Sequence, residues 1–255
     1  MLQGDVLDAG GEKISPAHAY QPHLKLYYYR SIEVETPIPF EETVLFRDDY
    51  LLAVDKPHFL PVTPGGRYLQ QTLLVRLKRK LGIDTIAPMH RIDRETAGLV
   101  LFTIKPETRG IYQQLFSMQA VEKSYQAVAA RRDDLSFPLR YESRLVSADH
   151  FMRMREEAGV ANALTEISIL ETGATLTRYR LQPRTGKKHQ LRVQMAALGM
   201  PILNDQIYPT HRSKADIERD DFSQPLQLLA EKISFTDPIS GELRRFASTR
   251  RLQAI

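Results

Sequence analysis

Residues 90 to 102 read HRIDRETAGLVLF and place five ionisable side chains directly before one of the most apolar runs in the chain. The run from Ala97 to Phe102 is apolar without alternation, which is typical of a strand that is buried on both faces. Asp93 would then lie at the mouth of a buried strand, where water is scarce. An isolated charge in such a place is costly unless a cation faces it. The segment is therefore either a solvated surface turn or the site of a carboxylate that is kept for chemistry.

Spacing alone favours the turn, in which Asp93 would accept hydrogen bonds from backbone amides before the strand begins. Three chemical alternatives are disfavoured because the motifs they require are missing or interrupted. The seven histidines contain no H-x-H or H-x-x-x-H pair that would suggest a metal site. Ile92 interrupts the H-R-D of a protein kinase loop, and neither G-x-G-x-x-G nor D-F-G accompanies it. A serine hydrolase would need G-x-S-x-G, which the chain lacks.

Composition limits the class of protein. With 255 residues, 42% of them hydrophobic, the chain can form one large domain, alone or with a small appendage. It has no cysteine, which excludes a disulfide framework, a thiolate zinc site and a cysteine nucleophile. Residues 1 to 11 hold two aspartates and no basic residue before Glu12, and no run of eighteen apolar residues occurs. We therefore expect a cytoplasmic protein without a membrane segment.

The net charge of +4 is small, but the cations are clustered. Such clusters favour a polyanionic partner over a membrane, because none adjoins a large free apolar stripe. They comprise Arg76, Lys78, Arg79 and Lys80; Arg184, Lys187 and Lys188; and Arg244, Arg245, Arg250 and Arg251.

The hydrophobic patterns predict several hairpins and three helices. One helix should carry leucines every fourth residue from Leu69 to Leu81 and end at Gly82. A second should start at Pro106, with Ile111 on its apolar face, and a third should span 189–199. Strands or hairpins are expected at 24–30, 45–57, 124–130, 164–170, 175–181 and 227–246. Because hairpins outnumber strand-helix-strand units, we expect an α+β fold around a large, mostly antiparallel sheet.

Several residues have two interpretations at this stage. The stretch PRTGKKHQ (183–190) could grip phosphates through its cations and the Gly186 amide, or it could be an ordinary charged connection. Arg192 lies off the apolar stripe of its helix and is expected at the surface. Tyr125 is expected to be a core aromatic residue, and the cations at 76–80 a solvated helix face.

Five stretches, taken in order, resemble the RluA-type family of RNA pseudouridine synthases. They are DYLLAVDKP (49–57), HRIDRETAGL (90–99), EKSYQAV (122–128), RTGKKHQLRV (184–193) and PILNDQIY (201–208), and the agreement runs from about residue 41 to 247. The resemblance implies a pseudouridine synthase fold with a large mixed sheet, flanking helices and loops, and a central catalytic cleft. It implies a catalytic domain over 41–255, preceded by a short extension over 1–40 that would be a reduced or truncated RNA-binding module.

The resemblance also implies how the site works. Asp93 corresponds to the essential aspartate, the nucleophile that acts on a flipped-out uridine. Arg192 would be its buried partner, which keeps the carboxylate ionised and oriented. Tyr125 would stack on the uracil and help to remove the proton from the base carbon, while Leu191 would pack on the other side. Arg91 would enter the RNA stack to fill the vacated space.

Phosphate contact is the implied role of the remaining candidates, His90, Lys123, Lys187 and Lys188. Since the reaction is an isomerisation, the resemblance implies no cofactor and no metal. The implied partner is structured ribosomal or transfer RNA, with no membrane and no DNA, and we expect a monomer. An alternative is an RNA-binding or RNA-folding protein on the same fold with little or no turnover. A basic interaction domain without any site is a third interpretation.

The chain departs from the family pattern at four positions. Ala97 stands where serine is frequent, Gln194 and Met200 where histidine is frequent, and Asn204 where glycine is usual. None of these positions is Asp93, Tyr125 or Arg192, so we expect the departures to affect RNA contacts rather than the chemistry.

Overall fold

The computed structural model describes residues 6–28, 35–148, 153–209, 221–253 and 255. The chain divides into two compact units, Met1–Glu35 and Thr36–Ile255. In the first unit, strands β1 (Val6–Leu7) and β2 (Tyr27–Tyr28) pair antiparallel. The strand expected over 24–30 is thus reduced to two described residues, and its last two positions lie outside the described part. The division falls close to the expected boundary at residue 40, but the interpretation of the first unit as an RNA-binding module stays a prediction.

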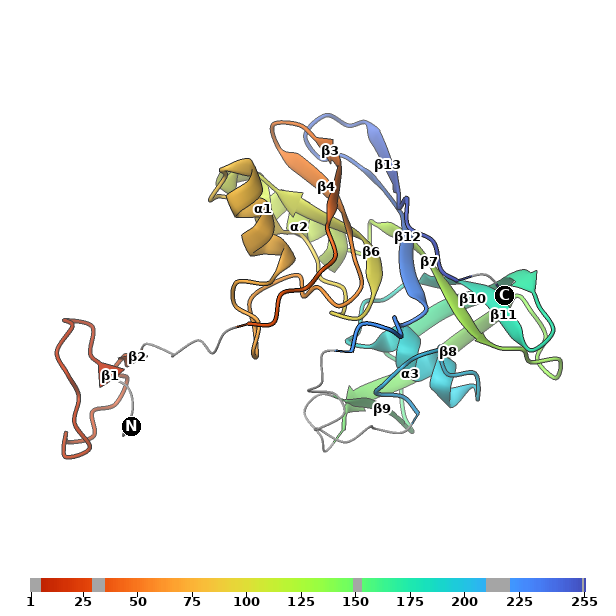
Figure 1. Ribbon diagram of the computed structural model, residues 1–255, viewed down its shortest axis with the longest axis horizontal. Helices are drawn as coiled ribbons and strands as arrows, with labels where there is room; N and C mark the ends of the chain where they lie inside the picture. Colours follow the sequence, from red (N-terminus) through yellow and green to blue (C-terminus); the bar gives the residue numbers. More distant parts are fainter. Residues whose placement is uncertain (1–5, 29–34, 149–152, 210–220, 254) are drawn as a thin grey trace. The chain divides into compact units, whose positions relative to one another are not determined.

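The second unit is built on an eleven-stranded sheet with the order β3-β4-β6-β12-β7-β11-β10-β8-β9, to which β5 and β13 add at β6 and β12 (Figure 1). Among the described pairings, β6 with β12 is parallel and the rest are antiparallel, so the expected mixed, mostly antiparallel α+β fold is confirmed. The strands are β3 (Thr43–Arg47), β4 (Leu51–Lys56), β5 (Ala87–Pro88), β6 (Ala97–Thr103), β7 (Glu122–Ala130), β8 (Leu139–Ser147), β9 (Met154–Glu157), β10 (Ala163–Thr172), β11 (Leu176–Pro183), β12 (Leu228–Thr236) and β13 (Leu243–Ala247).

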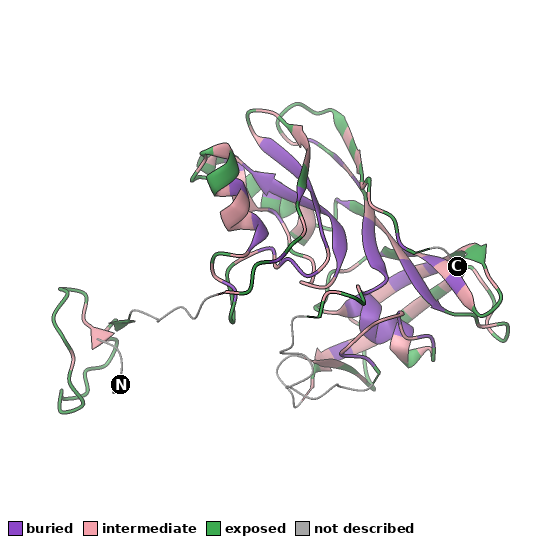
Figure 2. Cartoon of the chain, viewed as in Figure 1, coloured by how far each residue is buried: buried purple, intermediate pink, exposed green. Residues whose placement is uncertain are grey.

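Strand β6 is buried along its whole length, as its apolar sequence predicts (Figure 2). Alternate residues face two different cores. Val100 and Phe102 pack in a cluster with Leu73 and Leu77 of helix α1 (Leu73–Leu81). Leu99 and Leu101 pack in a second cluster with Tyr112 of helix α2 (Arg109–Ser117), which follows the short 3-10 helix η1 (Pro106–Thr108). The strand is therefore covered by one helix on each face, which explains why it does not alternate.

Helix α1 ends as predicted but begins a turn later. Gly82 follows it with a φ of 66°, a left-handed conformation that glycine adopts easily. At the other end the Thr72 hydroxyl accepts a hydrogen bond from the amide of Val75, so the helix starts at Leu73 rather than Leu69. The expected solvated cationic face is wrong for Arg76, because its guanidinium donates to the carbonyls of Ile38 and Phe40 at 2.7 Å each.

Helix α3 (Gln190–Ala197) corrects the placement of Arg192. Leu191 and Met195 pack on β7 and β11, as the spacing predicts. The opposite side of the helix is covered as well, because Val193 packs with Leu145 and Tyr208. The helix is therefore buried almost all round, and Arg192, which we expected at the surface, is 1% exposed. The cover on this side comes from Leu145 of β8 and from Tyr208, both outside the helix.

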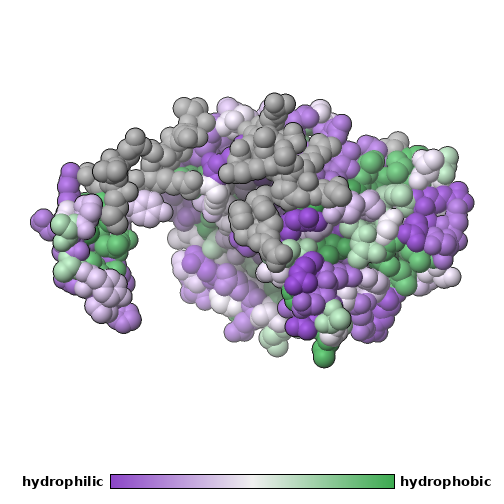
Figure 3. Space-filling view, turned by 90° about the horizontal axis from the view of Figure 1, so that it is seen from below, coloured by the Kyte–Doolittle hydropathy of each residue, from purple (hydrophilic) through white to green (hydrophobic). Residues whose placement is uncertain are grey.

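Two further differences concern local patterns. In α2 the prediction is wrong for Ile111, which is exposed, whereas Leu115 and Phe116, expected on the same face, pack with the buried Tyr112. Strands β8 and β9 were not predicted, because β8 mixes charged and apolar residues without regular alternation and β9 has only four residues, three of them charged. No helix among the described residues is long and apolar enough to cross a membrane. On the face shown in Figure 3, hydrophilic and hydrophobic residues are interspersed over the second unit.

Candidate active site

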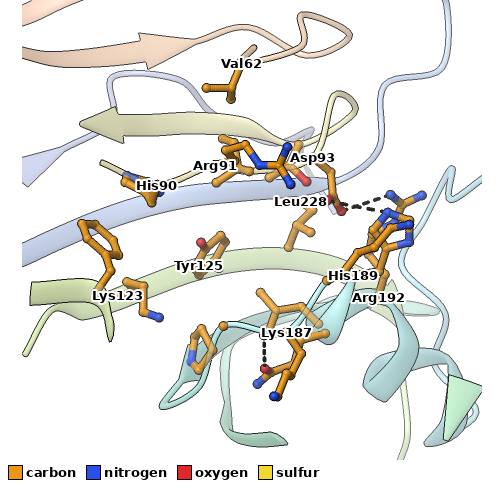
Figure 4. A pocket seen from close by; sticks show the side chains of 18 of the residues that line it. Val62, His90, Arg91, Asp93, Lys123, Tyr125, Lys187, His189, Arg192 and Leu228 are labelled. Atoms are coloured by element: carbon orange, nitrogen blue, oxygen red, sulfur yellow. Dashed lines mark hydrogen bonds and ion pairs between the residues drawn. The ribbon is translucent and has the colours of Figure 1, made fainter. Parts of the chain in front are cut away.

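A cavity of about 610 Å³ opens in the second unit where several segments meet. They include the turn before β6, strand β7, the loop after β11 and the start of α3. Every candidate residue lines this cavity: Arg91, His90, Asp93, Lys123, Tyr125, Lys187, Lys188, Leu191 and Arg192. In Figure 4, Asp93 faces Arg192 and His189, and Tyr125 lies across the cavity from them. Residues far apart in the sequence converge here because β12 lies between β6 and β7 and pairs with both.

The Asp93 carboxylate is paired with Arg192. Nη1 of the guanidinium lies 3.2 Å from Oδ2 of Asp93. The Asp93 side chain is 25% exposed, so it faces the cavity while its partner is fully enclosed. The guanidinium offsets part of the cost of placing the carboxylate at the mouth of a buried strand. The cation that a charge at this strand mouth requires is therefore present.

Arg192 is itself held by a second carboxylate. Its Nε and Nη2 each donate to Asp205 at 2.8 Å, a two-pronged arrangement that fixes the plane of the guanidinium. Glu95 adds a contact of 3.5 Å to Nη1. Burial alone would lower the pKa of Arg192, but the hydrogen bonds and charge of Asp205, with Asp93 and Glu95, raise it above its ordinary value. The guanidinium therefore stays charged at any pH at which the protein is folded.

Hydrogen bonds from buried side chains hold the turn that carries Asp93. The ammonium of Lys56 donates to the carbonyls of Pro57 and Arg94, and the carbonyl of Glu95 lies 2.7 Å from Nδ1 of His58. Burial lowers the pKa of Lys56 to about 7, although the charges of Glu95 and Asp93 oppose the shift. The turn interpretation is thus correct in part: the amide of Thr96 donates to the main-chain carbonyl of Asp93, while the carboxylate turns to Arg192.

Tyr125, Leu191 and Leu228 form apolar walls of the cavity. Tyr125 packs at the edge of the core cluster of β7, β11 and α3, to which Leu191 and Leu228 also belong. Burial, and then the negative charge of Asp93, raise the pKa of the Tyr125 phenol. The hydroxyl is therefore protonated at neutral pH. Such a site suits a flat, uncharged ring between an aromatic side chain and aliphatic side chains.

The cationic residues differ in how they meet the cavity. Arg91 and Lys187 are exposed at its rim. Lys123 is half-buried, donates to the carbonyl of Thr185, and has its pKa lowered by burial. Arg184, which we grouped with the phosphate-gripping loop, instead forms two hydrogen bonds with Glu166. The loop itself is held by Gln190, whose Oε1 accepts from the Thr185 hydroxyl and the Lys187 amide.

His90 also lines the cavity, but it is neutral. Its ring stacks on Phe116 at 4.5 Å between centroids, and its Nε2 accepts a hydrogen bond from the amide of Leu101. Burial, followed by the charge of Lys123, lowers the pKa of His90 to about 3. Since Nε2 is an acceptor, the ring proton lies on Nδ1. Any phosphate contact by His90 would therefore be a hydrogen bond and not a charge pair.

Sequence reasoning missed His189, Asp205 and Tyr208, which surround the Asp93–Arg192 pair. Nε2 of His189 lies 3.7 Å from Oδ1 of Asp93, and its Nδ1 lies 3.0 Å from the Tyr208 hydroxyl. All three residues stand inside stretches that carried the family resemblance, 184–193 and 201–208, but neither spacing nor charge singles them out. Among the described residues, no group of three or more His, Cys, Asp and Glu side chains is arranged to hold a metal ion.

Known proteins are similar to this chain over most of its length. The profile of the RNA pseudouridylate synthase family matches residues 50–197. The dual-specificity RNA pseudouridine synthase RluA of Haemophilus influenzae is 29% identical over 218 residues, which are 84% of this chain and 96% of that protein. The tRNA pseudouridine synthase C of Pasteurella multocida is 31% identical over 216 residues, which are 78% of this chain and 87% of that protein.

A solved structure has the same fold. Human RNA pseudouridylate synthase domain containing 1 superimposes with a TM-score of 0.66 at 21% identity, covering 85% of this chain and 86% of that one. The family match spans more than half of the chain, and the tRNA pseudouridine synthase C sequence is matched over most of its length. This chain belongs to the RluA-type family of RNA pseudouridine synthases, a family of isomerases that act on RNA.

Proposed function

We propose that this enzyme converts uridine to pseudouridine at specific positions of ribosomal or transfer RNA, with Asp93 as the nucleophile. The observation that carries the proposal is the Asp93 carboxylate, which faces an open cavity at 25% exposure while Arg192 holds its Oδ2 at 3.2 Å. A structural ion pair would have no need of a partly exposed carboxylate beside a cavity. The names of the two relatives, one a dual-specificity RNA enzyme and one a tRNA enzyme, support transfer RNA as a substrate class.

The cavity suits a base that has left the RNA stack. Tyr125 offers an aromatic face for the uracil, and Leu191 and Leu228 offer aliphatic cover. Stacking of one base on an aromatic side chain contributes about 1–3 kcal/mol. That interaction would retain the free uracil while its bond to the ribose is open, since otherwise the base could diffuse away. Arg91, which is exposed at the rim, would fill the gap that the flipped nucleotide leaves in the RNA.

The reaction is an internal exchange of bonds. Asp93 attacks either the ribose C1′ or the base, the bond between N1 and C1′ breaks, and the uracil turns. A bond then forms between C5 and C1′, and the bond to Asp93 breaks, which restores the carboxylate. C5 loses its proton and N1 gains one, so that atoms and electrons balance without an external reagent. Tyr125 is a candidate for the proton removal at C5. Since its phenol is protonated at neutral pH, it could do so only after passing its own proton to another group.

RNA binding is proposed to rest on phosphate contacts of Arg91, Lys123, Lys187 and Lys188, with a hydrogen bond from His90. Lys187 is exposed beside the cavity, at the mouth where the RNA backbone would pass. The first unit, which carries exposed Tyr20 and Tyr28, is proposed as a reduced RNA-binding module. A monomeric state, a cytoplasmic location and the absence of a DNA partner also remain predictions.

The test uses RNA that carries tritium at C5 of its uridines, transcribed without modification. Formation of the new bond at C5 releases the label into water. We expect release by the wild-type protein and by Asp84→Asn, a control that changes an exposed aspartate, and no release by Asp93→Asn. Full activity of Asp93→Asn would reject the nucleophile. Binding of RNA without release by any of the proteins would favour the alternative, an RNA-folding protein that flips bases without turnover.

A further inference from the structure

The two oxygens of the Asp93 carboxylate lie in different surroundings. Arg192 holds Oδ2 at 3.2 Å, whereas Oδ1 faces Nε2 of His189 at 3.7 Å (Figure 4). The His189 side chain is 10% exposed, so its ring stays beside the carboxylate rather than in solvent. Burial lowers the pKa of His189, although Asp93 opposes the shift, so the ring is neutral at neutral pH. A neutral imidazole carries its proton on only one nitrogen, and which one it is decides what Asp93 meets.

The Tyr208 hydroxyl determines that choice. Its oxygen accepts a hydrogen bond from the amide of Met154 at 2.9 Å, and it lies 3.0 Å from Nδ1 of His189. With one lone pair occupied by the amide, the hydroxyl proton is free to point at Nδ1. Nδ1 is then an acceptor, and the ring proton lies on Nε2, directed at Asp93. The opposite tautomer would turn a nitrogen lone pair toward a carboxylate oxygen, which is repulsive.

The backbone at His189 is held in an uncommon conformation. Its φ of 53° and ψ of 19° are left-handed, and this residue immediately precedes α3. A residue other than glycine adopts this region at some expense in free energy, and such strain persists where the surroundings fix it. Here the fold places the imidazole between Tyr208 and Asp93. The same turn brings Arg192, three residues on, to the other oxygen of the carboxylate.

We infer that His189 is a positioning residue for the Asp93 nucleophile, in its Nε2–H tautomer set by Tyr208. At 3.7 Å the contact is longer than a hydrogen bond, and it would close as the carboxylate moves against a bound uridine. In that state Arg192 and His189 together fix both oxygens of Asp93, one by charge and one by a neutral donor. The inference rests on the proposed role of Asp93, and it adds a residue that acts through Asp93 and not on the RNA.

Two substitutions at His189 separate this role from a structural one. The amide nitrogen of glutamine can reach the place of Nε2, whereas that of asparagine reaches only the place of Nδ1. Asparagine, however, is the better residue for a left-handed backbone. If His189 merely forms the turn, His189→Asn should be the milder change. If it positions Asp93, His189→Asn should lower kcat about tenfold to a hundredfold, as expected for one lost hydrogen bond to a charged group, with KM for the RNA unchanged.

His189→Gln should recover most of the lost turnover. The inference is overturned if His189→Asn turns over RNA as fast as the wild type, or if His189→Gln is no better than His189→Asn. A second measurement does not depend on turnover. Nitrogen-15 NMR of histidine-labelled protein distinguishes the two tautomers, and we expect Nε2–H at His189 in the wild type and a mixture in Tyr208→Phe. An Nδ1–H tautomer in the wild type would overturn the inference. This result does not depend on tritium release, so it can be told apart from a failure of the proposed function.

Discussion

Arg192 donates two hydrogen bonds of 2.8 Å to Asp205, whereas it approaches Asp93 through a single contact of 3.2 Å. The side chains of Arg192 and Asp205 are each 1% exposed. Asp205 also accepts hydrogen bonds from the amides of Ile207 and Tyr208. Asp205 is therefore the structural partner of the arginine. Asp93 pairs with a guanidinium that Asp205 already keeps charged and oriented. Stability and catalysis should accordingly depend on different carboxylates.

The first prediction compares these two carboxylates. Asp205→Asn should lower the free energy of unfolding by about 3–5 kcal/mol, because it leaves a buried cation without its main partner. Asp93→Asn removes only the more exposed partner and should change that free energy by less than about 1 kcal/mol. Urea unfolding of both variants at pH 7 measures the difference. Equal losses, or a larger loss in Asp93→Asn, would contradict the assignment of Asp205 as the structural partner.

The second prediction separates stacking by Tyr125 from its hydroxyl chemistry. Tyr125→Phe keeps the aromatic face, so RNA affinity should stay within about twofold of the wild type while turnover falls. Tyr125→Ala removes the face and should also weaken RNA binding by about 1–3 kcal/mol. Filter binding and tritium release measure the two quantities on the same RNA. Undiminished turnover by Tyr125→Phe would exclude the hydroxyl from proton removal at C5.

The third prediction concerns the acid limb of stability. Burial lowers the pKa of His90 to about 3, below its ordinary value of 6.5. Between these two pH values His90 is protonated in the unfolded chain but not in the folded protein. Stability is therefore fully present above pH 6.5 and is lost as the pH falls from 6.5 towards 3. From pH 7 to pH 5 this loss should be about 2 kcal/mol.

His90→Gln is the matched variant for this effect. The glutamine oxygen can accept the hydrogen bond of the Leu101 amide, but it does not titrate. Its unfolding free energy should fall by about 2 kcal/mol less than that of the wild type between pH 7 and pH 5. The loss that remains should include the contribution of His58, whose pKa burial lowers to about 4. Parallel curves for the two proteins would show that His90 is not the group that titrates.

The fourth prediction is that RNA binding weakens steeply with salt. Each phosphate neutralised by a lysine or arginine releases counterions, so the logarithm of affinity falls linearly with the logarithm of salt concentration. Lys187→Gln should reduce that slope by about 0.7–0.9, the contribution of one phosphate contact. Lys232→Gln, which removes a lysine of β12 paired with Glu231, is the control and should leave the slope unchanged. An affinity that does not respond to salt would reject phosphate contact as the basis of binding.

Local patterns in the sequence predicted much of the fold, because each of these features depends on residues that are close together in the chain. The unbroken run at Ala97 to Phe102 predicted a strand covered on both faces, and Gly82 predicted the end of α1. The burial of Arg192 could not be predicted in this way. Its helix carries a one-sided apolar stripe, and the cover on the other side comes from Tyr208 and Leu145, which are distant in the sequence. Tertiary packing determines the burial of such positions, and the periodicity of apolar residues along a helix does not reveal it.

The candidate site shows the same division. Spacing favoured a plain turn at Asp93, and only the family resemblance linked it to Tyr125 and Arg192, which the fold then brings to one cavity. The resemblance also explains Asn204, which stands where glycine is usual. Its φ of 64° is left-handed, and asparagine tolerates that region better than most residues. Physical roles for Asp205 and His189 became visible only with their distances to Arg192 and Asp93.

The fifth prediction returns to the apolar run that defines the fold. Gly98 has a φ of 109°, and a Cβ atom at this position would overlap the backbone of Ala230, lying 2.7 Å from its nitrogen. Gly98 pairs with Ala230 where β6 and β12 run parallel. Gly98→Ala should therefore force the two strands apart and lower the free energy of unfolding by about 3 kcal/mol or more, from backbone strain and overpacking together.

Gly110→Ala is the matched control for this change. Gly110 lies within α2, and a Cβ there would meet nothing within 4 Å. Alanine should stabilise the helix by about 0.5–1 kcal/mol, because it restricts the unfolded chain and favours helix. Urea unfolding of both variants at one pH tests the pair. Because β6 carries the Asp93 turn, a folded Gly98→Ala protein should also lose turnover. Stability equal to the wild type would show that the β6–β12 pairing is looser than this close approach requires.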